Sequence, residues 1–277
     1  MKFFEQEYFS GEELSDVLVE GDCIQIMDRL PDEIFDMVFI DPPYYLQLPT
    51  SRKLRRWGVK TEVNGVDEEW DKFKSFEEYD SFVVKVLERV QRLMKPDATL
   101  WVIGTYHNIH RWGKIMQDMG FWILNDVIWL KTNPMPNWLG VRFTNATETL
   151  IWAVKDKGSK KYTFNKEYAK QFGIGKIYEN VWRIPICSGE ERLRDEKGNK
   201  VHPTQKPVEL LKRVILTSTR EGDLILDPMA GVGTTGFVAK MLRRRFFMIE
   251  KERIYVEWTK ARLKKFSKTA YSLKNDV

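Results

Sequence analysis

The chain has 277 residues and is 43% hydrophobic, with 16 Phe and 10 Trp, so it can bury a large core. Its formal net charge of +5 indicates one basic face rather than a uniformly basic protein. Two cysteines, Cys23 and Cys187, provide no disulfide framework, and three histidines without clustered thiols offer no metal site. Because no apolar run approaches the roughly 18 residues of a membrane span and no signal-peptide pattern is present, we expect a cytoplasmic protein.

Strand and helix patterns alternate along the chain. Apolar runs predict seven strands, at Asp16–Glu20, Phe35–Ile40, Thr99–Ile103, Trp122–Trp129, Leu150–Ala153, Asp223–Leu226 and Arg245–Ile249. Helical spacing is clearest at Glu77–Met94 and Val208–Thr219. This alternation predicts an α/β fold with a Rossmann-like, doubly wound, mostly parallel seven-stranded sheet. Two stretches, Gln47–Trp70 and Lys131–Val201, break the pattern, and we expect them as insertions above the strand ends, where ligands bind.

The run Asp41-Pro42-Pro43-Tyr44 directly follows the apolar residues 37–40. An acid, two residues with restricted φ and an aromatic ring at the end of a buried strand can form a rigid pocket for a flat ring that bears an amino group. Such a pocket suits methylation of an exocyclic amine. A plain strand-ending turn is the alternative for this tetrapeptide alone.

A second motif covers residues 224–236 and reads as a strand, a glycine turn and the start of a helix. Its glycines fit the dinucleotide fingerprint, and an acid follows at Glu250, so a nicotinamide enzyme is one interpretation. The pairs Asp227-Pro228 and Thr234-Thr235 favour a cofactor without a pyrophosphate, which needs polar side chains as well as close backbone approach. Helix packing through small residues would explain the glycines but not Glu250, whose carboxylate can accept from both hydroxyls of a ribose.

Together the two motifs resemble those of the amino methyltransferases that use S-adenosylmethionine, and the catalytic motif precedes the cofactor motif, as in β-group DNA methyltransferases. Further stretches resemble the cell-cycle-regulated and HinfI-type adenine methyltransferases of GANTC; they are residues 65–73, 101–109, 133–137, 142–150 and 202–207. The resemblance runs from Val19 to Phe266. It implies a site-specific enzyme that transfers a methyl group from S-adenosylmethionine to N6 of adenine in duplex DNA, within GANTC. One departure is Tyr45, where the branch often has Asn or Phe.

The same resemblance implies one methyltransferase domain over residues 1–277. Its catalytic part covers about 16–130, its target-recognition insertion about 131–201 and its cofactor-binding part about 202–266. The branch usually carries an additional C-terminal DNA-contacting domain, whereas this sequence ends at Val277. We therefore expect a homodimer, or a preference for partly single-stranded sites, where flipping a base costs less. A cognate restriction endonuclease is a further expected partner.

The resemblance also assigns the site residues. The catalytic motif is Asp41, Pro42, Pro43 and Tyr44: the Asp41 carboxylate and the Pro42 carbonyl would accept the amine hydrogens, and Tyr44 would stack on the flipped base. A buried core tyrosine is the alternative for Tyr44. The expected cofactor residues are Asp22, Cys23, Asp41, Thr204, Lys206, Asp227, Pro228, Met229, Gly231, Gly233, Thr234, Thr235 and Glu250. For Thr204 and Lys206 the alternative is a helix N-terminal turn with a solvated lysine.

DNA contacts are expected from basic and amide side chains in the two insertions. They are Arg52, Lys53, Arg55, Arg56, Asn133, Arg142 and Asn145. A solvated charged face is the alternative for the basic residues, and turn formation for Asn133. Cytosine-N4 methylation is the alternative chemistry, although Asp41 in place of an initial Ser favours adenine. A non-catalytic DNA-binding protein on the same fold would need a broken motif, and none is broken.

Overall fold

The computed structural model describes residues 14–46, 52–56, 59–63, 69–137, 140–172 and 178–272. Within these residues the main sheet has eight strands in the order β1-β10-β9-β2-β5-β7-β6-β8. The strands are β1 (Val17–Glu20), β2 (Phe35–Ile40), β5 (Met94–Gly104), β6 (Trp122–Lys131), β7 (Thr147–Val154), β8 (Val181–Ile184), β9 (Leu224–Asp227) and β10 (Arg245–Glu250). Only β7 pairs with its neighbours in antiparallel fashion. The predicted mostly parallel α/β sheet is therefore confirmed, and each of the seven predicted strands is present.

The eighth strand, β8, lies within the stretch 131–201 and pairs with β6 at the edge of the sheet. Its four residues alternate between Trp182 and Ile184, which are buried, and their more exposed neighbours. A run this short carries too little periodicity to separate a strand from a loop. The stretch 131–201 thus contributes β7 and β8 to the sheet. Its described irregular parts include residues 132–137 and 140–146, and the segments 155–165 and 170–172 on either side of α4 (Lys166–Ala169).

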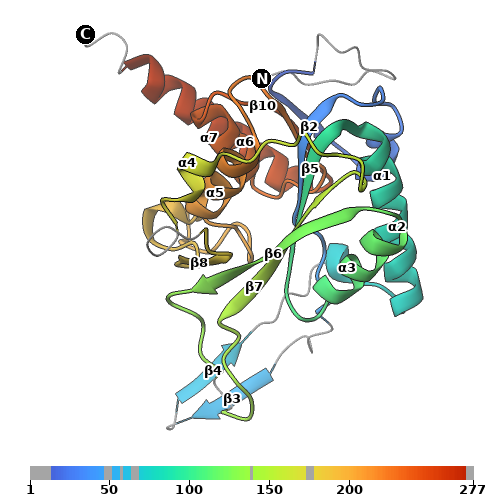
Figure 1. The fold of residues 1–277 in the computed structure, drawn as a ribbon. Coiled ribbons are helices and arrows are strands. Elements are labelled where there is room, and N and C mark those ends of the chain that lie inside the picture. The colour runs from blue at the N-terminus through green and yellow to red at the C-terminus, as the bar shows by residue number, and fades with distance from the viewer. Residues whose placement is uncertain are drawn as a thin grey trace.

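Helices cover both faces of the sheet (Figure 1). On one face lie α1 (Cys23–Met27), α2 (Phe76–Leu93) and α3 (Ile109–Asp118). On the other lie α5 (Val208–Ser218), α6 (Thr234–Met241) and α7 (Arg253–Ser272). Each layer closes its own apolar core against the sheet, as a doubly wound fold requires. In the described ranges, every helix is too short or too polar to span a bilayer.

Helix α2 illustrates how sequence sets the layer that supports the site. The Ser75 hydroxyl accepts a hydrogen bond from the backbone N–H of Glu78 at 3.2 Å and caps the first turn. Tyr79, Val83 and Val86 recur at helical spacing and are fully buried. The helix thereby fixes the Tyr79 side chain against the end of β2.

The stretch between 47 and 70 forms a small hairpin where it is described. Strands β3 (Arg52–Arg56) and β4 (Val59–Val63) pair in antiparallel fashion as a separate two-stranded sheet. The hairpin stands apart from the main sheet (Figure 1).

The strand order places a ligand-binding crevice at one edge of the sheet. Strands β1, β10, β9 and β2 are parallel neighbours, so their C-terminal ends lie together. From β9 the chain continues to β10 on one side, whereas from β2 the sheet continues to β5 on the other. The strand order therefore reverses between the paired strands β9 and β2. Such a topological switch point is the usual place for a ligand in sheets of this kind.

Candidate active site

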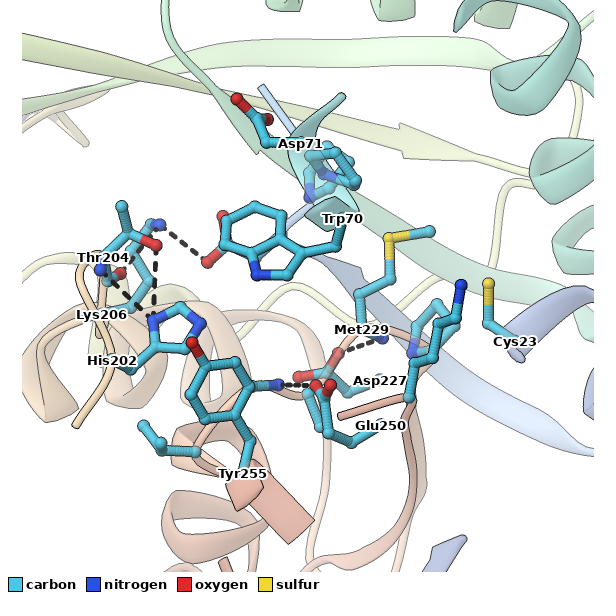
Figure 2. Close-up of a pocket in the computed structure, with 18 of the residues that line it drawn as sticks. Cys23, Trp70, Asp71, His202, Thr204, Lys206, Asp227, Met229, Glu250 and Tyr255 are labelled. Carbon is cyan, nitrogen blue, oxygen red and sulfur yellow. Dashed lines mark hydrogen bonds and ion pairs between the residues drawn. The ribbon is translucent and has the colours of Figure 1, made fainter. Parts of the chain in front are cut away.

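A cavity of about 330 Å³ opens at this switch point. Four neighbouring strand ends each supply it with a carboxyl group: Asp22 after β1, Glu250 on β10, Asp227 on β9 and Asp41 after β2. The arrangement explains how Asp41 and Asp227 meet although they lie far apart in the sequence. Figure 2 shows Asp227 and Glu250 side by side below Trp70 and opposite Cys23.

The glycine turn after β9 is held by Glu250. Its carboxylate accepts hydrogen bonds from the backbone N–H groups of Gly231 at 2.6 Å and Glu252 at 2.8 Å. Gly231 has φ 53°, and a Cβ atom there would meet the imidazole of His202 at 3.3 Å. The positive φ strains any other residue at this position, and the imidazole leaves little room for a side chain. The backbone of Gly231 can therefore approach a ligand closely.

The other two glycines of the fingerprint serve packing. A Cβ atom on Gly233 would lie 2.3 Å from Cγ2 of Thr259 in α7, and one on Gly236 would lie 2.4 Å from Cε of Met248 in β10. Gly233 also begins α6 with φ 69°. It is not among the residues that line the cavity, so its contact with the cofactor stays a prediction. The fingerprint spacing cannot separate a glycine that faces the ligand from one that lets a helix approach a neighbour.

Burial shifts several ionisable groups in the cavity. It raises the pKa of Asp227 and that of Glu250 to about 7. It lowers the pKa of His202 to about 3, helped by Lys206, so the imidazole stays neutral and its Nδ1 accepts the backbone N–H of Thr204 at 3.2 Å. Burial also raises the pKa of Cys23 to about 12, so this residue is a thiol rather than a nucleophilic thiolate.

Asp41 stands at the centre of a polar network. Its Oδ2 atom lies 2.7 Å from Nζ of Lys206, and its Oδ1 atom lies 3.1 Å from the hydroxyl of Tyr44. Burial raises the pKa of Asp41, and the lysine opposes this shift. The same Tyr44 hydroxyl lies 3.0 Å from Oε2 of Glu148, whose other oxygen pairs with Lys131 at 2.9 Å. Glu148 carries no predicted role, although it belongs to the resembling stretch 142–150, because strand β7 reaches Tyr44 from 104 positions away.

The backbone of the catalytic motif is fixed from two sides. The Asp71 carboxylate accepts the N–H groups of Tyr44, Tyr45 and Leu46 at 2.6, 2.7 and 2.9 Å. The Tyr79 hydroxyl donates to the Pro43 carbonyl at 2.7 Å. Within the described ranges the Pro42 carbonyl accepts no hydrogen bond, so it remains available to a ligand.

Tyr44 is both a wall of the cavity and a largely buried residue, at 7% exposure. The Lys206 ammonium lies 5.1 Å from the centre of its ring. Tyr45 stands where the resembling methyltransferases often have Asn or Phe. It has φ 50°, and its ring stacks on that of Tyr79 with the ring centroids 5.7 Å apart. Asn tolerates this backbone conformation better than Tyr does, and here ring packing and Asp71 hold it.

Aromatic residues without a predicted role complete the cavity wall. The Trp70 ring lies nearly parallel to that of His202, with the ring centroids 6.0 Å apart. The rings of His202 and Tyr255 are arranged edge to face, with their centroids 4.6 Å apart. Figure 2 shows these rings above and beside the Glu250 carboxylate. Trp70 and Asp71 belong to the resembling stretch 65–73, which was the available signal for both.

The cavity brings together the whole predicted catalytic motif and all predicted cofactor residues except Gly233. The lining includes Asp22, Cys23, Asp41, Pro42, Pro43, Tyr44, Thr204, Lys206, Asp227, Pro228, Met229, Gly231, Thr234, Thr235 and Glu250. Lys206 is buried and paired with Asp41, so its alternative as a solvated lysine is wrong.

The predicted DNA-contacting residues lie outside this cavity. Arg52, Lys53, Arg55 and Arg56 are on strand β3. Asn133 uses its side-chain oxygen to accept the N–H of Ile186 at 2.7 Å, so it at least stabilises a turn. Arg142 donates to the Tyr106 hydroxyl at 3.0 Å, and Asn145 is exposed.

Fold and site together define a Rossmann-like transferase with an acidic, aromatic-walled cavity and an Asp-Pro-Pro-Tyr motif at its mouth. The sequence model of the N6/N4 DNA methylases matches residues 35–261, and the chain belongs to this family. It is 48% identical over 247 residues to the type II methyltransferase M.HinfI of Haemophilus influenzae, across 89% of this chain and 68% of that protein. It is 40% identical over 249 residues to the type II methyltransferase M2.LlaDCHI of Lactococcus lactis subsp. cremoris, across 90% and 89% of the two chains. The crystal structure of an M1.HpyAVI–SAM complex superposes with a TM-score of 0.63 at 26% identity, covering 89% of this chain and 98% of that one.

Proposed function

We propose that this DNA methyltransferase uses S-adenosylmethionine to methylate N6 of adenine in duplex DNA, within GANTC. The observation that carries the proposal is the position of Asp41 and the Pro42 carbonyl beside the acidic cavity at the β9–β2 switch point. An initial Asp in the motif favours adenine over cytosine, and the resemblance to HinfI-type enzymes favours GANTC.

The cavity fits the proposed cofactor. S-adenosylmethionine carries a positively charged sulfonium, and when bound it supplies an electrophilic methyl group. The carboxyl groups of Asp227 and Glu250 face the space beside the Gly231 turn, where a cation would stabilise their ionised forms. Glu250 can accept hydroxyls of a ribose, and Asp22 and Cys23 would lie beside the adenine of the cofactor.

Asp41 and Pro42 would orient the target amine. An exocyclic amino group is a poor nucleophile because its lone pair is delocalised into the ring. If the Asp41 carboxylate and the Pro42 carbonyl each accept one amine hydrogen, the lone pair turns towards the methyl donor, and alignment supplies much of the rate. The Lys206 ammonium lies 2.7 Å from Oδ2 of Asp41, and its positive charge favours the ionised form of this carboxyl group.

The base must leave the helix to reach this cavity. The rings of Tyr44 and Trp70 line it and offer faces for stacking. The described parts of the β6–β7 connection, residues 132–137 and 140–146, expose three large apolar side chains around Arg142: Met135 at 61%, Val141 at 77% and Phe143 at 98% exposure. We assign this loop and the β3–β4 hairpin to DNA contact. A homodimer and a cognate endonuclease stay predictions.

Incubation of the chain with methyl-labelled S-adenosylmethionine and a mixed plasmid, followed by base-resolved mapping, tests the proposal. The expected mark is on adenine within GANTC. Marks on the exocyclic amine of cytosine would overturn the base assignment. Marks on adenine in another motif would overturn the site alone, since they would show that the resemblance covers the catalytic scaffold but not base readout.

A further inference from the structure

A row of three oxygen-bearing side chains leads from the reacting centre to the surface. Asp41 Oδ1 lies 3.1 Å from the Tyr44 hydroxyl, which lies 3.0 Å from Glu148 Oε2. Asp41 and Tyr44 line the cavity, whereas Glu148 does not. The Glu148 side chain is 11% exposed and pairs with Lys131, which is equally exposed. Glu148 therefore touches the reacting centre through Tyr44 alone and has some access to water.

The Tyr44 hydroxyl lies within hydrogen-bond distance of two carboxyl groups, and both contacts are favourable only if the two carboxyl groups share one proton. A phenol has one hydrogen, so the Tyr44 hydroxyl can donate to Asp41 or to Glu148 but not to both. The second oxygen contact, at about 3 Å, is satisfied when the Asp41 carboxyl is protonated and donates to the phenol oxygen, while the Tyr44 hydroxyl donates to Glu148, the carboxylate that pairs with Lys131. Burial and the two carboxylates hold the pKa of Tyr44 well above its ordinary value, so the phenol itself stays protonated. A proton can then cross it only by exchange, entering on one side while another leaves on the other.

We propose that Glu148, acting through the Tyr44 hydroxyl, receives the proton that the target amine loses on methylation. The nitrogen–methyl bond forms as the sulfur–methyl bond breaks, and the amine nitrogen becomes positively charged. Before this, Asp41 has sent its resting proton along the row to Glu148 and on to water, so that its carboxylate can accept an amine hydrogen. After methyl transfer one amine proton passes to Oδ1 of Asp41, the Asp41 carboxyl gives a proton to the Tyr44 oxygen, and the Tyr44 hydrogen passes to Oε2 of the ionised Glu148. Glu148 then releases it to water. The products are a neutral methylated amine, S-adenosylhomocysteine and one proton.

The neighbouring charges favour this direction. Lys206 occupies Oδ2 of Asp41 at 2.7 Å and leaves Oδ1 to face Tyr44. Lys131 holds the far oxygen of Glu148 at 2.9 Å and orients Oε2 towards Tyr44. Glu148 sits opposite Trp129 on the β6–β7 ladder, so its backbone is fixed by the sheet. Glu148 is a positioning and proton-accepting residue, and it acts on either exocyclic amine that the N6/N4 family methylates.

The test compares Glu148→Gln, Tyr44→Phe and the double variant in single-turnover methyl transfer. Glutamine can donate to the Tyr44 oxygen and leave the Tyr44 hydrogen to Asp41, so it keeps the hydrogen bonds but cannot take up a proton. We expect each single variant to slow transfer about 100-fold and the double variant to slow it no further. Affinities for S-adenosylmethionine and for DNA should change less than about twofold. Glu33→Gln, which removes the carboxylate of the Lys155–Glu33 pair, is the matched control and should keep the wild-type rate.

Two measurements separate a proton role from a structural one. Formate should restore transfer to Glu148→Ala, because a small carboxylate can enter the vacated space. In the infrared spectrum of the cofactor-free protein, a protonated-carboxyl band of Asp41 should be present in the wild type and in Glu33→Gln. Glu148→Gln should remove it, because the glutamine amide then donates to the Tyr44 oxygen and the Tyr44 hydrogen turns to an ionised Asp41. Full activity in Glu148→Gln, additive losses in the double variant or failure of formate would each overturn the proposal. The proton path rests on the proposed role of Asp41 in methyl transfer, and Asp41→Ala distinguishes a failure of the path from a failure of that role. An active Asp41→Ala protein refutes the proposed mechanism. An inactive Asp41→Ala protein together with an active Glu148→Gln protein refutes the proton path alone.

Discussion

The Asp71 carboxylate accepts a hydrogen bond from the backbone N–H of Tyr44 at 2.6 Å, although Asp71 follows Tyr44 by 27 positions. It also accepts the next two N–H groups, so one buried side chain sets the backbone just after the two prolines. The prolines restrict φ within the motif, and Asp71 fixes where the chain goes next. The direction of the Tyr44 ring follows from both.

Replacing Asp71 should therefore impair alignment more than ligand binding. Asp71→Asn turns one acceptor into a donor that opposes a backbone N–H. We expect methyl transfer to fall about 100-fold, as a misplacement of about 1 Å does, while the dissociation constant of S-adenosylmethionine changes little. Asp97→Asn is the control, because Asp97 likewise accepts a backbone N–H, from Lys161 at 3.0 Å, but it lies on strand β5 outside the cavity lining. Equal loss of rate in both variants would contradict a specific role for Asp71.

Asp41→Ala should abolish methyl transfer and leave the fold intact. The carboxylate lies in the cavity wall and orients the nucleophile, whereas the apolar core beneath it belongs to strand β2. Thermal unfolding and circular dichroism should match the wild type closely. Labelled-methyl transfer to DNA measures the activity, and near-normal turnover by a folded Asp41→Ala protein would refute the proposed mechanism.

The sequence predicts the scaffold well because the scaffold depends on local patterns. Each of the seven predicted strands contains a short apolar run, and helices α2 and α5 show clear helical spacing, so the sequence predicts both kinds of element to within a few residues. The catalytic and cofactor motifs follow strand ends, and the parallel sheet alone brings them together.

The remaining parts depend on contacts between distant segments. Asp71 and Glu148 reach Tyr44 from 27 and 104 positions away, and neither spacing is a periodic signal. The packing of Thr259 of α7 against Gly233 is likewise not encoded by the fingerprint, and the contact of Gly233 with the cofactor stays a prediction. The edge strand β8 was missed because its four residues carry too little pattern.

The two loop glycines should respond differently to substitution. Gly231→Leu places a side chain against His202 and in the cavity, so S-adenosylmethionine should bind more weakly by orders of magnitude. Gly233→Ala collides with Thr259 at φ 69° and should lower the free energy of unfolding by at least about 1 kcal/mol. The folded fraction should keep its cofactor affinity.

Calorimetry and denaturant titration separate these effects. Tyr44→Ala completes the comparison: it should spare cofactor binding and weaken capture of the flipped base, where stacking contributes about 1–3 kcal/mol. If Gly231→Leu and Tyr44→Ala lost the cofactor equally, the division of the cavity between cofactor and base would be wrong.

The stability of the cofactor-free protein and its affinity for the cofactor should change in opposite directions with pH. Burial raises the pKa of Glu250 from 4.5 and that of Asp227 from 3.8, in each case to about 7. Between the ordinary and the raised values the folded state holds protons that the unfolded state has lost. The free energy of unfolding contributed by these groups is therefore greatest at low pH and declines as the pH rises towards about 7.

The affinity for the cofactor should follow the opposite pH dependence, because the positively charged sulfonium favours ionised carboxylates. We expect its dissociation constant to fall as the pH rises from about 5 to about 7 and then to level off. Isothermal calorimetry across this range measures the effect. Glu250→Gln should flatten the dependence, and it also serves as the control, because titration of the cofactor itself is common to both proteins. A steeper dependence in Glu250→Gln than in the wild type would show that Glu250 does not face the cofactor.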